Sequence, residues 1–461
     1  MLRFLPILSA LLLGAMGLSG FAAEQATNLQ QLSIPIDYYT LDNGLRVVLA
    51  PDSSIPTVTI GTYYHIGFRI EPRNRTGFAH LFEHLMFQET PNLKKGEADR
   101  VIAGNGGLGN GSTRFDYTNY FEVVPNNVLE ATLYVEADRM RGLAISEASI
   151  QNQKDVVKNE VRVNVLNRPY GGFPWLDLPQ AANKNWFNAH NFYGELEEIE
   201  AATGADIAAF YTSYYIPSNA VLVIAGDFDP QKIRAQVAAQ FASLPARPAP
   251  PRPDLSEPKQ TAPQETTRTD PLAPRPALAF GYHLPPRNTA DWYAFLLLDV
   301  ILLQGEESRL WQRLVTERGY ADSIEGGVNL LGTAYDYEGP MLWSASLVHD
   351  SGLDEARVLT EVESVIASLR HSPVSAAELA TARTKVRSAL YDVAGSPDRF
   401  GLVEILASSA LFDNDPTAVN RIESRLGKIT PKQIQTVARK YLVPTNRTVV
   451  HLRAGAASAT P

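Results

Sequence analysis

The order of apolar and polar residues predicts a β-rich start that leads into one short helix. Residues 38–50 form two short runs around Asp42-Asn43-Gly44, a turn sequence typical of β-hairpins. Residues 57–66 alternate and are rich in β-branched and aromatic side chains, which predicts a strand. A helix is expected from about residue 77 to residue 88. Further helices are expected at 129–140 and 150–166, and a buried strand at 220–225.

A proline-dense stretch divides the chain into halves of similar size. Residues 245–276 hold ten prolines in 32 positions, with scattered charges and few large apolar groups. Such a sequence cannot build a core, so an extended linker is expected there. With 461 residues, the chain is too long for one ordinary core. The expected domains are therefore 30–244, with the candidate metal site, and 277–455, without one.

The second half of the chain opens as the first half does. A predicted strand at 277–282 is followed by Pro286-Arg287-Asn288 and an apolar helix, just as Pro72-Arg73-Asn74 precedes the helix at 77–88. A shared tripeptide can arise by chance, but it agrees with a duplicated α+β unit whose second copy has lost its metal site. At the positions equivalent to His80, Glu83 and His84, the second half has Ala294, Leu297 and Leu298.

The candidate chemistry lies in the helix at 77–88. His80 and His84 are one turn apart on one helical face, and Glu83 flanks them. Two neutral imidazoles at this spacing can share a zinc ion, and a neighbouring carboxylate can accept a proton from an activated water. A pair of histidines on a helix is more often incidental. However, burying these three polar side chains among apolar neighbours without a partner would cost several kcal/mol. The motif therefore favours a zinc hydrolase.

A third zinc ligand is expected from a distant part of the chain. Glu160 lies one turn after Val156 and Val157 on the predicted helix at 150–166, so it points to the apolar face, where a free carboxylate is disfavoured. It can equally be a glutamate at the boundary of a wide apolar stripe. Periodicity alone leaves both interpretations open.

Composition and the N-terminus bear on where the protein works. Arg3 and a short apolar run precede Gly20-Phe21-Ala22, which predicts a signal peptide at 1–23 that is cleaved on export. The chain has no cysteine, which excludes disulfides, thiol catalysis and thiolate zinc sites. A net charge of −9 gives no sign of nucleic-acid binding. A periplasmic enzyme without a membrane span in its mature chain is expected, with a disordered tail at 456–461.

With the motif in place, the sequence resembles the pitrilysin/insulinase-type zinc peptidases, the inverzincins, and especially their short bacterial and mitochondrial-processing-peptidase-like members. The resemblance implies that His80, His84 and Glu160 bind one Zn²⁺ per chain and that Glu83 is the general base. It also implies an α+β fold of two homologous domains, each a mixed β-sheet packed with α-helices, joined by the Pro-rich linker and enclosing a chamber. The matching segments are 41–45 (LDNGL), 77–84 (GFAHLFEH), 156–160 (VVKNE), 167–171 (NRPYG) and 225–228 (AGDF).

The resemblance also suggests where a substrate binds. Residues 108–113 are glycine-rich and would by themselves read as a loop, but in the family this segment is an edge strand that pairs with the substrate backbone. Asn110, Thr113 and Tyr120 are the expected substrate-binding residues. Gln153 stands where many relatives have a second glutamate, and it is expected to support a zinc ligand from outside the first shell.

The clearest departure from the family lies in the second half. Active single-chain relatives carry an arginine and a tyrosine that stabilise the reaction's oxyanion, and here Val315 and Asp322 occupy those positions. A shifted pair, Arg313 and Tyr320, would keep the spacing but break the alignment. The expectation is therefore a zinc-dependent endopeptidase whose homologous partner subunit supplies the missing pair. Two alternatives stay open: a non-catalytic scaffold subunit and a self-sufficient homodimeric peptidase.

Overall fold

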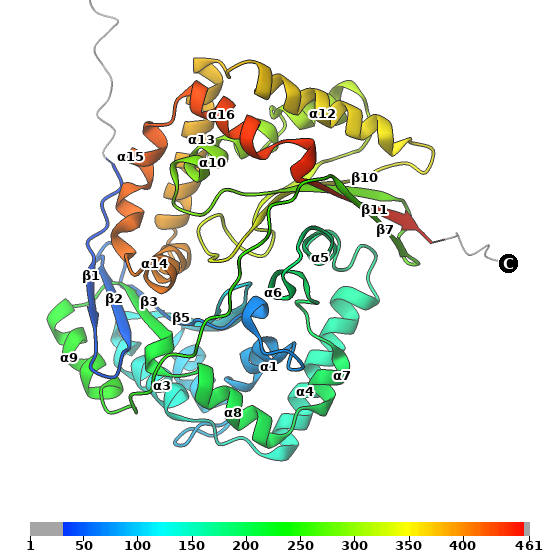
Figure 1. The fold of residues 1–461 in the computed structure, drawn as a ribbon. Coiled ribbons are helices and arrows are strands. Elements are labelled where there is room, and N and C mark those ends of the chain that lie inside the picture. The colour runs from blue at the N-terminus through cyan, green and yellow to red at the C-terminus, as the bar shows by residue number, and fades with distance from the viewer. Residues whose placement is uncertain (1–30, 456–461) are drawn as a thin grey trace, which may run out of the picture.

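The computed structural model describes residues 31–455, which fold into two halves, each with one β-sheet and its own helices. In Figure 1 the first half occupies the lower part of the view and the second half the upper part, with α14 between them. No helix in this described part of the chain has the length and apolar character that a membrane span needs. The predicted signal peptide at 1–23 and the predicted tail at 456–461 lie outside the described residues.

The first sheet has six strands in the order β1-β2-β6-β3-β5-β4. The hairpin β1–β2 and the strands β3 and β6 confirm the predictions at 38–50, 57–66 and 220–225. Every residue of β6 is buried because both faces of the sheet are covered. The strands are β1 (Asp37–Thr40), β2 (Arg46–Pro51), β3 (Thr57–Tyr64), β4 (Leu108–Thr113), β5 (Thr118–Pro125) and β6 (Ala220–Gly226).

The second sheet repeats the topology of the first. Its order β7-β11-β8-β10-β9 matches β2-β6-β3-β5-β4, with the first pair of strands parallel and every later pair antiparallel in both sheets. The two halves are therefore homologous α+β units, as predicted. The strands are β7 (Gln264–Asp270), β8 (Ala277–His283), β9 (Glu325–Val328), β10 (Leu342–Val348) and β11 (Arg447–Ala454).

The shared tripeptide has a structural cause. Asn74 and Asn288 both adopt a left-handed backbone conformation, with φ of 65° and 63°. Asparagine tolerates this conformation better than most residues. Each asparagine lies in the connection between a strand and the helix that follows it. The two tripeptides therefore form the same turn in the two units.

One sequence prediction is corrected here. The linker expected at 245–276 contains β7, which pairs in parallel with β11 at the edge of the second sheet. The seven residues of β7 contain no proline, and three of them are threonines, whose β-branched side chains favour strands. Because β7 is mostly exposed, its sequence lacks the apolar pattern that would reveal a strand.

Helices of the first half pack on one face of the first sheet, and their apolar residues form a core with Leu49 and Ile224. The helix predicted at 150–166 is α4, which continues as the π-helical turn η4 (Arg162–Leu166). The helices are α1 (Phe78–Leu85), α2 (Glu97–Ile102), α3 (Leu129–Arg141), α4 (Glu147–Val161), α5 (Asp177–Ala182), α6 (Trp186–Ala189), α7 (Leu196–Ala201), α8 (Gly204–Tyr214) and α9 (Pro230–Phe241).

The second half covers the opposite face of the first sheet. There α14 packs so closely on β3 that a Cβ at Gly61 would lie 2.7 Å from Val403 Cγ1. Alternate residues of β2 and β6, such as Val48 and Val223, join the core of the second half. Its helices are α10 (Ala290–Leu302), α11 (Arg309–Trp311), α12 (Glu355–His371), α13 (Ala376–Ala394), α14 (Phe400–Asp413), α15 (Ile422–Gly427) and α16 (Pro431–Tyr441).

A buried cluster of acids ties the two halves together. The Tyr117 hydroxyl of the first half lies 2.9 Å from Glu404 and 3.2 Å from Asp336, both of the second half. Burial, and then the charge of Glu404, raise the pKa of Asp336 to about 7. Burial also raises the pKa of Glu404. A carboxyl whose pKa is raised on folding contributes stability at low pH, and that stability is lost as the pH rises through the folded pKa.

Asp336→Asn should therefore stabilise the protein in a pH-dependent way. The amide keeps an oxygen acceptor for Asn329 and for the Thr333 backbone N–H, but it cannot ionise. Relative to wild type, we expect the variant to raise the urea midpoint at about pH 8 and to have less effect at about pH 5. Asp322→Asn, at an exposed aspartate, is the matched control. A difference that does not change with pH would contradict the expectation.

Candidate metal centre

Helix α1 holds His80 and His84 in place through its opposite face. Phe78, Leu81, Phe82 and Leu85 are buried in the core of the first half. The start of α1 is fixed by the buried Glu71, whose carboxylate accepts hydrogen bonds from the N–H groups of Gly77 (2.9 Å) and Ala79 (2.5 Å). Because the apolar face cannot rotate out of the core, the two histidines point away from it.

Glu160 on α4 meets the two histidines. Its Oε2 lies 3.3 Å from His84 Nε2 and 3.8 Å from His80 Nε2, and the two Nε2 atoms are 3.3 Å apart. We call these three residues the metal trio. Glu160, which periodicity left ambiguous, thus lies with the histidines and not at a solvated boundary. Its side chain is 36% exposed, against 6% for His80, so the trio is open on one side.

The trio suits a divalent cation better than it suits a network of hydrogen bonds. Burial, with a smaller effect of His84, lowers the pKa of His80 to about 3, so this ring is neutral at physiological pH. Its Nδ1 is buried and has no hydrogen-bond partner among the described residues. Two imidazoles and one carboxylate with an open side are the donor set that zinc takes in hydrolases.

Glu83 lies beside the trio and is held by β4. The Thr113 hydroxyl donates to Glu83 Oε2 at 2.7 Å, and a Cβ at Gly111 would lie 3.3 Å from Glu83 Cγ. Burial raises the pKa of Glu83. Thr113 was predicted to bind substrate. Its side chain is instead buried against Glu83, so its contact is with the predicted base.

β4 is an edge strand. The resemblance to the family implied this strand, whereas the sequence by itself favoured a loop. It ends the first sheet beyond β5, and Leu108, Gly109 and Asn110 are exposed. The Asn110 side chain accepts a hydrogen bond from the Gly111 N–H at 2.9 Å. Asn110 is exposed on this strand, and its contact with a substrate stays a prediction.

Two other expected residues have different surroundings. Tyr120 is fully buried, and its hydroxyl donates to the Phe82 carbonyl at 3.0 Å, so it cannot touch a substrate as predicted. It instead braces α1 from the strand side. Gln153 lies two turns before Glu160 and donates to Asn152 at 3.0 Å. Among the described residues, no hydrogen bond joins Gln153 to the trio.

The residues at the positions of the missing arginine and tyrosine make contacts within the second half. Val315 packs against the core, and Asp322 pairs with Arg275 at 3.1 Å. Arg313, the candidate in the shifted register, pairs with Glu317 at 3.0 Å and lies 3.8 Å from Glu361. A guanidinium neutralised by two carboxylates is a poor substitute donor, which favours the loss of the pair.

Sequence reasoning missed a group of aromatic rings beside His80. The Tyr193 ring lies 5.3 Å from the His80 ring, 6.1 Å from Phe68 and 5.4 Å from Trp175, measured between centroids. Residues 170–195 contain little regular periodicity, and no local pattern links them to α1. Only the tertiary fold reveals this neighbourhood.

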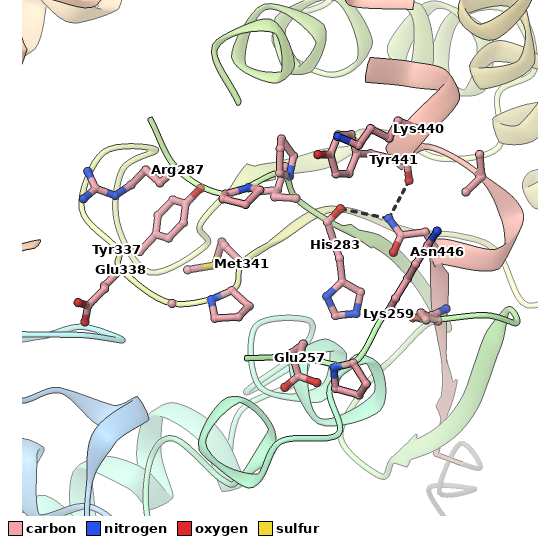
Figure 2. Close-up of a pocket in the computed structure, with 18 of the residues that line it drawn as sticks. Glu257, Lys259, His283, Arg287, Tyr337, Glu338, Met341, Lys440, Tyr441 and Asn446 are labelled. Atoms are coloured by element: carbon pink, nitrogen blue, oxygen red, sulfur yellow. Dashed lines mark hydrogen bonds between the residues drawn. The ribbon is translucent and has the colours of Figure 1, made fainter. Parts of the chain in front are cut away.

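One large cavity lies away from the metal centre, and no member of the metal trio lines it. Its volume is about 930 Å³, and it lies in the second half between the linker and the end of α16. Figure 2 shows His283, Met341 and Tyr441 around it, with Asn446 donating to the backbone oxygens of His283 and Tyr441. A smaller cavity of about 500 Å³ is lined by Trp175, whose ring contacts Tyr193. The set of donor residues, and not the size of a cavity, therefore identifies the candidate site.

Comparison with known proteins gives matches along both halves. Residues 46–169 match a family model described as insulinase (peptidase family M16), and residues 201–386 match one described as the peptidase M16 inactive domain. The zinc protease PqqE of Helicobacter pylori is 27% identical over 426 residues, which cover 90% of this chain and 92% of that protein. An uncharacterized zinc protease of Mycobacterium leprae is 24% identical, covering 87% and 88%.

Solved structures agree with the fold. The crystal structure of a protease from Helicobacter pylori has a TM-score of 0.83 and 26% identity, covering 91% of this chain and 99% of that chain. The periplasmic protease PqqL of Escherichia coli has a TM-score of 0.72 and 18% identity, covering 92% of this chain and 48% of that chain. The second comparison bears on the fold alone.

If the trio binds zinc, purified wild-type protein should contain one zinc ion per chain. His84→Ala and Glu160→Gln each remove a donor, so each should weaken zinc binding by more than the roughly 10- to 100-fold that supporting residues contribute. Metal analysis and zinc titration by calorimetry measure this. His371→Ala, at an exposed histidine, is the control. Wild-type zinc affinity in both ligand variants would contradict the assignment.

Proposed function

The chain belongs to the M16 family of insulinase-type peptidases, and on this basis we propose that it is a zinc-dependent endopeptidase. Its proposed substrates are peptides or unfolded polypeptide segments. The observation that supports the proposal is the convergence of His80, His84 and Glu160, from helices far apart in the chain, beside the carboxylate of Glu83.

Each residue of the site has a role in the proposed hydrolysis. His80 and His84 would hold zinc as neutral imidazoles, and Glu160 would hold it as a carboxylate. When bound, zinc supplies Lewis-acid chemistry that polarises a carbonyl and makes water more acidic. Glu83 accepts the proton of the attacking water and delivers it to the leaving amine nitrogen. Thr113 holds Oε2 of Glu83, which leaves Oε1 to carry that proton.

A peptide backbone is the substrate that the edge strand favours. The exposed N–H and C=O groups of β4 can pair with an extended chain, and β4 passes directly over Glu83. A peptide added to this edge brings its own backbone carbonyls toward the trio. A folded protein cannot present an unpaired strand in this way, which supports peptides and unfolded segments as substrates.

We also propose that the enzyme works in the periplasm. The signal peptide predicted at 1–23 supports export, and the absence of cysteine agrees with a protein that does not depend on disulfides. The Escherichia coli protein of the same fold is described as a periplasmic protease. Sequencing the N-terminus of protein purified from the native periplasm would test the location and the cleavage together.

A non-catalytic scaffold subunit is the rival function. One observation favours it, because residues 201–386 match the model described as the M16 inactive domain. That match lies outside α1 and contains no member of the trio. An inactive second unit is compatible with an active first unit, so the peptidase stays the preferred proposal.

The site needs donors for the oxyanion, and the relatives' arginine and tyrosine are absent at Val315 and Asp322. A homologous partner subunit would supply them, as predicted from the sequence. The purified chain alone should then cleave peptides far more slowly than the same chain with its closest co-expressed homologue. Full activity of the isolated monomer would discard the requirement for a partner, and activity confined to a dimer of this chain would support the homodimer.

Glu83→Gln should abolish peptide cleavage and leave zinc in place. The amide has nearly the same shape and can still accept from Thr113, but it cannot take up a proton. Loss of a general base lowers the rate by about 10²- to 10⁴-fold. Peptide turnover and zinc content are measured on the same sample. The matched control is Glu89→Gln, four residues after the helix ends. If the Glu83→Gln variant still cleaved peptides at the wild-type rate, Glu83 would not be the general base.

A further inference from the structure

Helix α4 and its continuation η4 carry apolar side chains on two different faces. Val157 is fully buried in the core of the first half, whereas Val156 and Val163 are 41% and 55% exposed. All three are neighbours of Glu160 on the helix surface, because they lie three or four residues from it. Around the helix axis, Glu160 lies between Val157 on the core side and the two exposed valines on the solvent side. The third member of the metal trio is therefore bordered by exposed apolar side chains.

Folding of the helix does not account for the two exposed valines. Valine has a lower helix propensity than alanine, glutamate or lysine, so an exposed helical position gains nothing for folding from it. Of the eight exposed large apolar side chains among the described residues, three belong to α4 and η4, namely Val156, Val163 and Leu166. Single exposed apolar residues are ordinary, whereas a group of them indicates a binding surface.

The helix also changes form next to the ligand. From Arg162 onward it is the π-helical η4, in which the Asn167 N–H donates to the Arg162 carbonyl at 2.7 Å, five residues back. Such wider turns are rare and are frequently found at functional sites. Val163 thus lies in a segment whose backbone, like its exposed side chain, is unusual for a helix that only supports the fold.

The exposed valines and the edge strand reach the trio from two different elements. β4 holds Glu83 through Thr113, and α4 brings Glu160 to the two histidines, while α1 packs against both β4 and α4 (Figure 1). A peptide paired with β4 keeps side chains on both of its faces, so those next to a carbonyl at the trio can approach α4. Along the helix axis, Val156 lies about 6 Å before Glu160 and Val163 about 4.5 Å after it. Apolar surface is thus available on both sides of the ligand.

A substrate side chain is the occupant of this surface that leaves the site usable. Glu160 lies between the two valines, and its side chain is 36% exposed. A partner subunit docked across both valines would cover Glu160 and close the open side of the trio, where water and substrate must enter. A substrate covers this side only while it is bound. The geometry therefore favours the substrate over a permanent protein contact.

We propose that Val156 and Val163 form the apolar wall of a subsite for the substrate residue next to the scissile bond. The enzyme would then cut preferentially beside residues with apolar side chains. This inference rests on the proposed peptidase function and narrows its substrate class. Unfolded segments expose the apolar residues that folded proteins bury, so the subsite also selects against folded proteins. The two valines determine specificity and take no part in the chemical steps.

Two fluorogenic peptides that differ only in leucine or asparagine next to the scissile bond test this preference. Each pair is made with the variable residue before the bond and after it, and is assayed in whichever form, chain alone or complex, cleaves peptides. We expect wild-type kcat/KM to be at least about tenfold higher with leucine in one of the two positions. In Val156→Thr/Val163→Thr, which keeps the branched shape and adds hydroxyls, this ratio should fall below about threefold. Zinc content should not change. Ile55→Thr, at an exposed β-branched residue between β2 and β3, is the matched control.

Two further measurements separate specificity from a structural role. Val163→Lys places an ammonium group at the subsite, so a peptide with glutamate in the sensitive position should be cleaved at least about fivefold faster than by wild type. A residue that only supports the helix would not create a new preference. In Glu83→Gln, which binds without turnover, calorimetry should show the leucine peptide bound about tenfold more weakly once Val156→Thr/Val163→Thr is added.

The outcomes distinguish the subsite from the peptidase function. Equal wild-type kcat/KM for the two peptides, or an undiminished leucine preference in Val156→Thr/Val163→Thr, would overturn the subsite and leave the peptidase intact. If that variant kept the preference but lost its partner subunit in sedimentation, this face would be a subunit contact and the subsite would again be overturned. A wild-type protein that binds no zinc and cleaves neither peptide would overturn the proposed function together with the subsite.

Discussion

The packing of one helical face into an apolar core is the constraint on which the site depends. Phe78, Leu81 and Phe82 of α1 are completely buried, so the helix has a single permitted rotation about its axis. That rotation sets His80, Glu83 and His84 on the opposite face. Grouping such polar side chains at the border of a core costs several kcal/mol unless each one finds a partner. Glu160 and Thr113 are partners that the fold supplies, and the proposed zinc would be a further partner for the two histidines.

Sequence patterns predicted the site where its geometry is local and failed where it is not. The spacing of His80 and His84 lies within one helical turn, so a single window of sequence reveals it. Glu160 was ambiguous, because the periodicity of a helix does not show which distant residues lie opposite it. The contacts of Thr113, Tyr120 and Tyr193 depend on strands and loops that pack on α1 from elsewhere. The same limit explains β7, whose exposed residues carry no apolar alternation and whose pairing with β11 spans most of the second half.

The equivalent helices α1 and α10 of the two units differ in the residues that the site uses. In α10 the positions equivalent to His80, Glu83 and His84 are Ala294, Leu297 and Leu298, and all three are fully buried. Helices α13 and α16 both pack on α10. A helix that is apolar all round is stable only when it is enclosed. At the three places where the first unit has polar residues of the site, the second unit therefore has apolar residues of its core.

The second unit still contributes to the site through its contacts with the first. The segment at 329–341 reaches across to the first half, where Glu338 pairs with His65 at 2.7 Å and the Pro340 carbonyl accepts from Arg69 at 2.6 Å. Arg69 is itself buried against Asp116 and follows directly on Phe68, whose ring borders both His80 and Tyr193. The contacts of Glu338 and Pro340 cross between the halves, so separating the halves would leave His65 and Arg69 without these partners. The second unit therefore helps to hold the residues that surround the metal trio, through its contacts with the segment that carries Phe68.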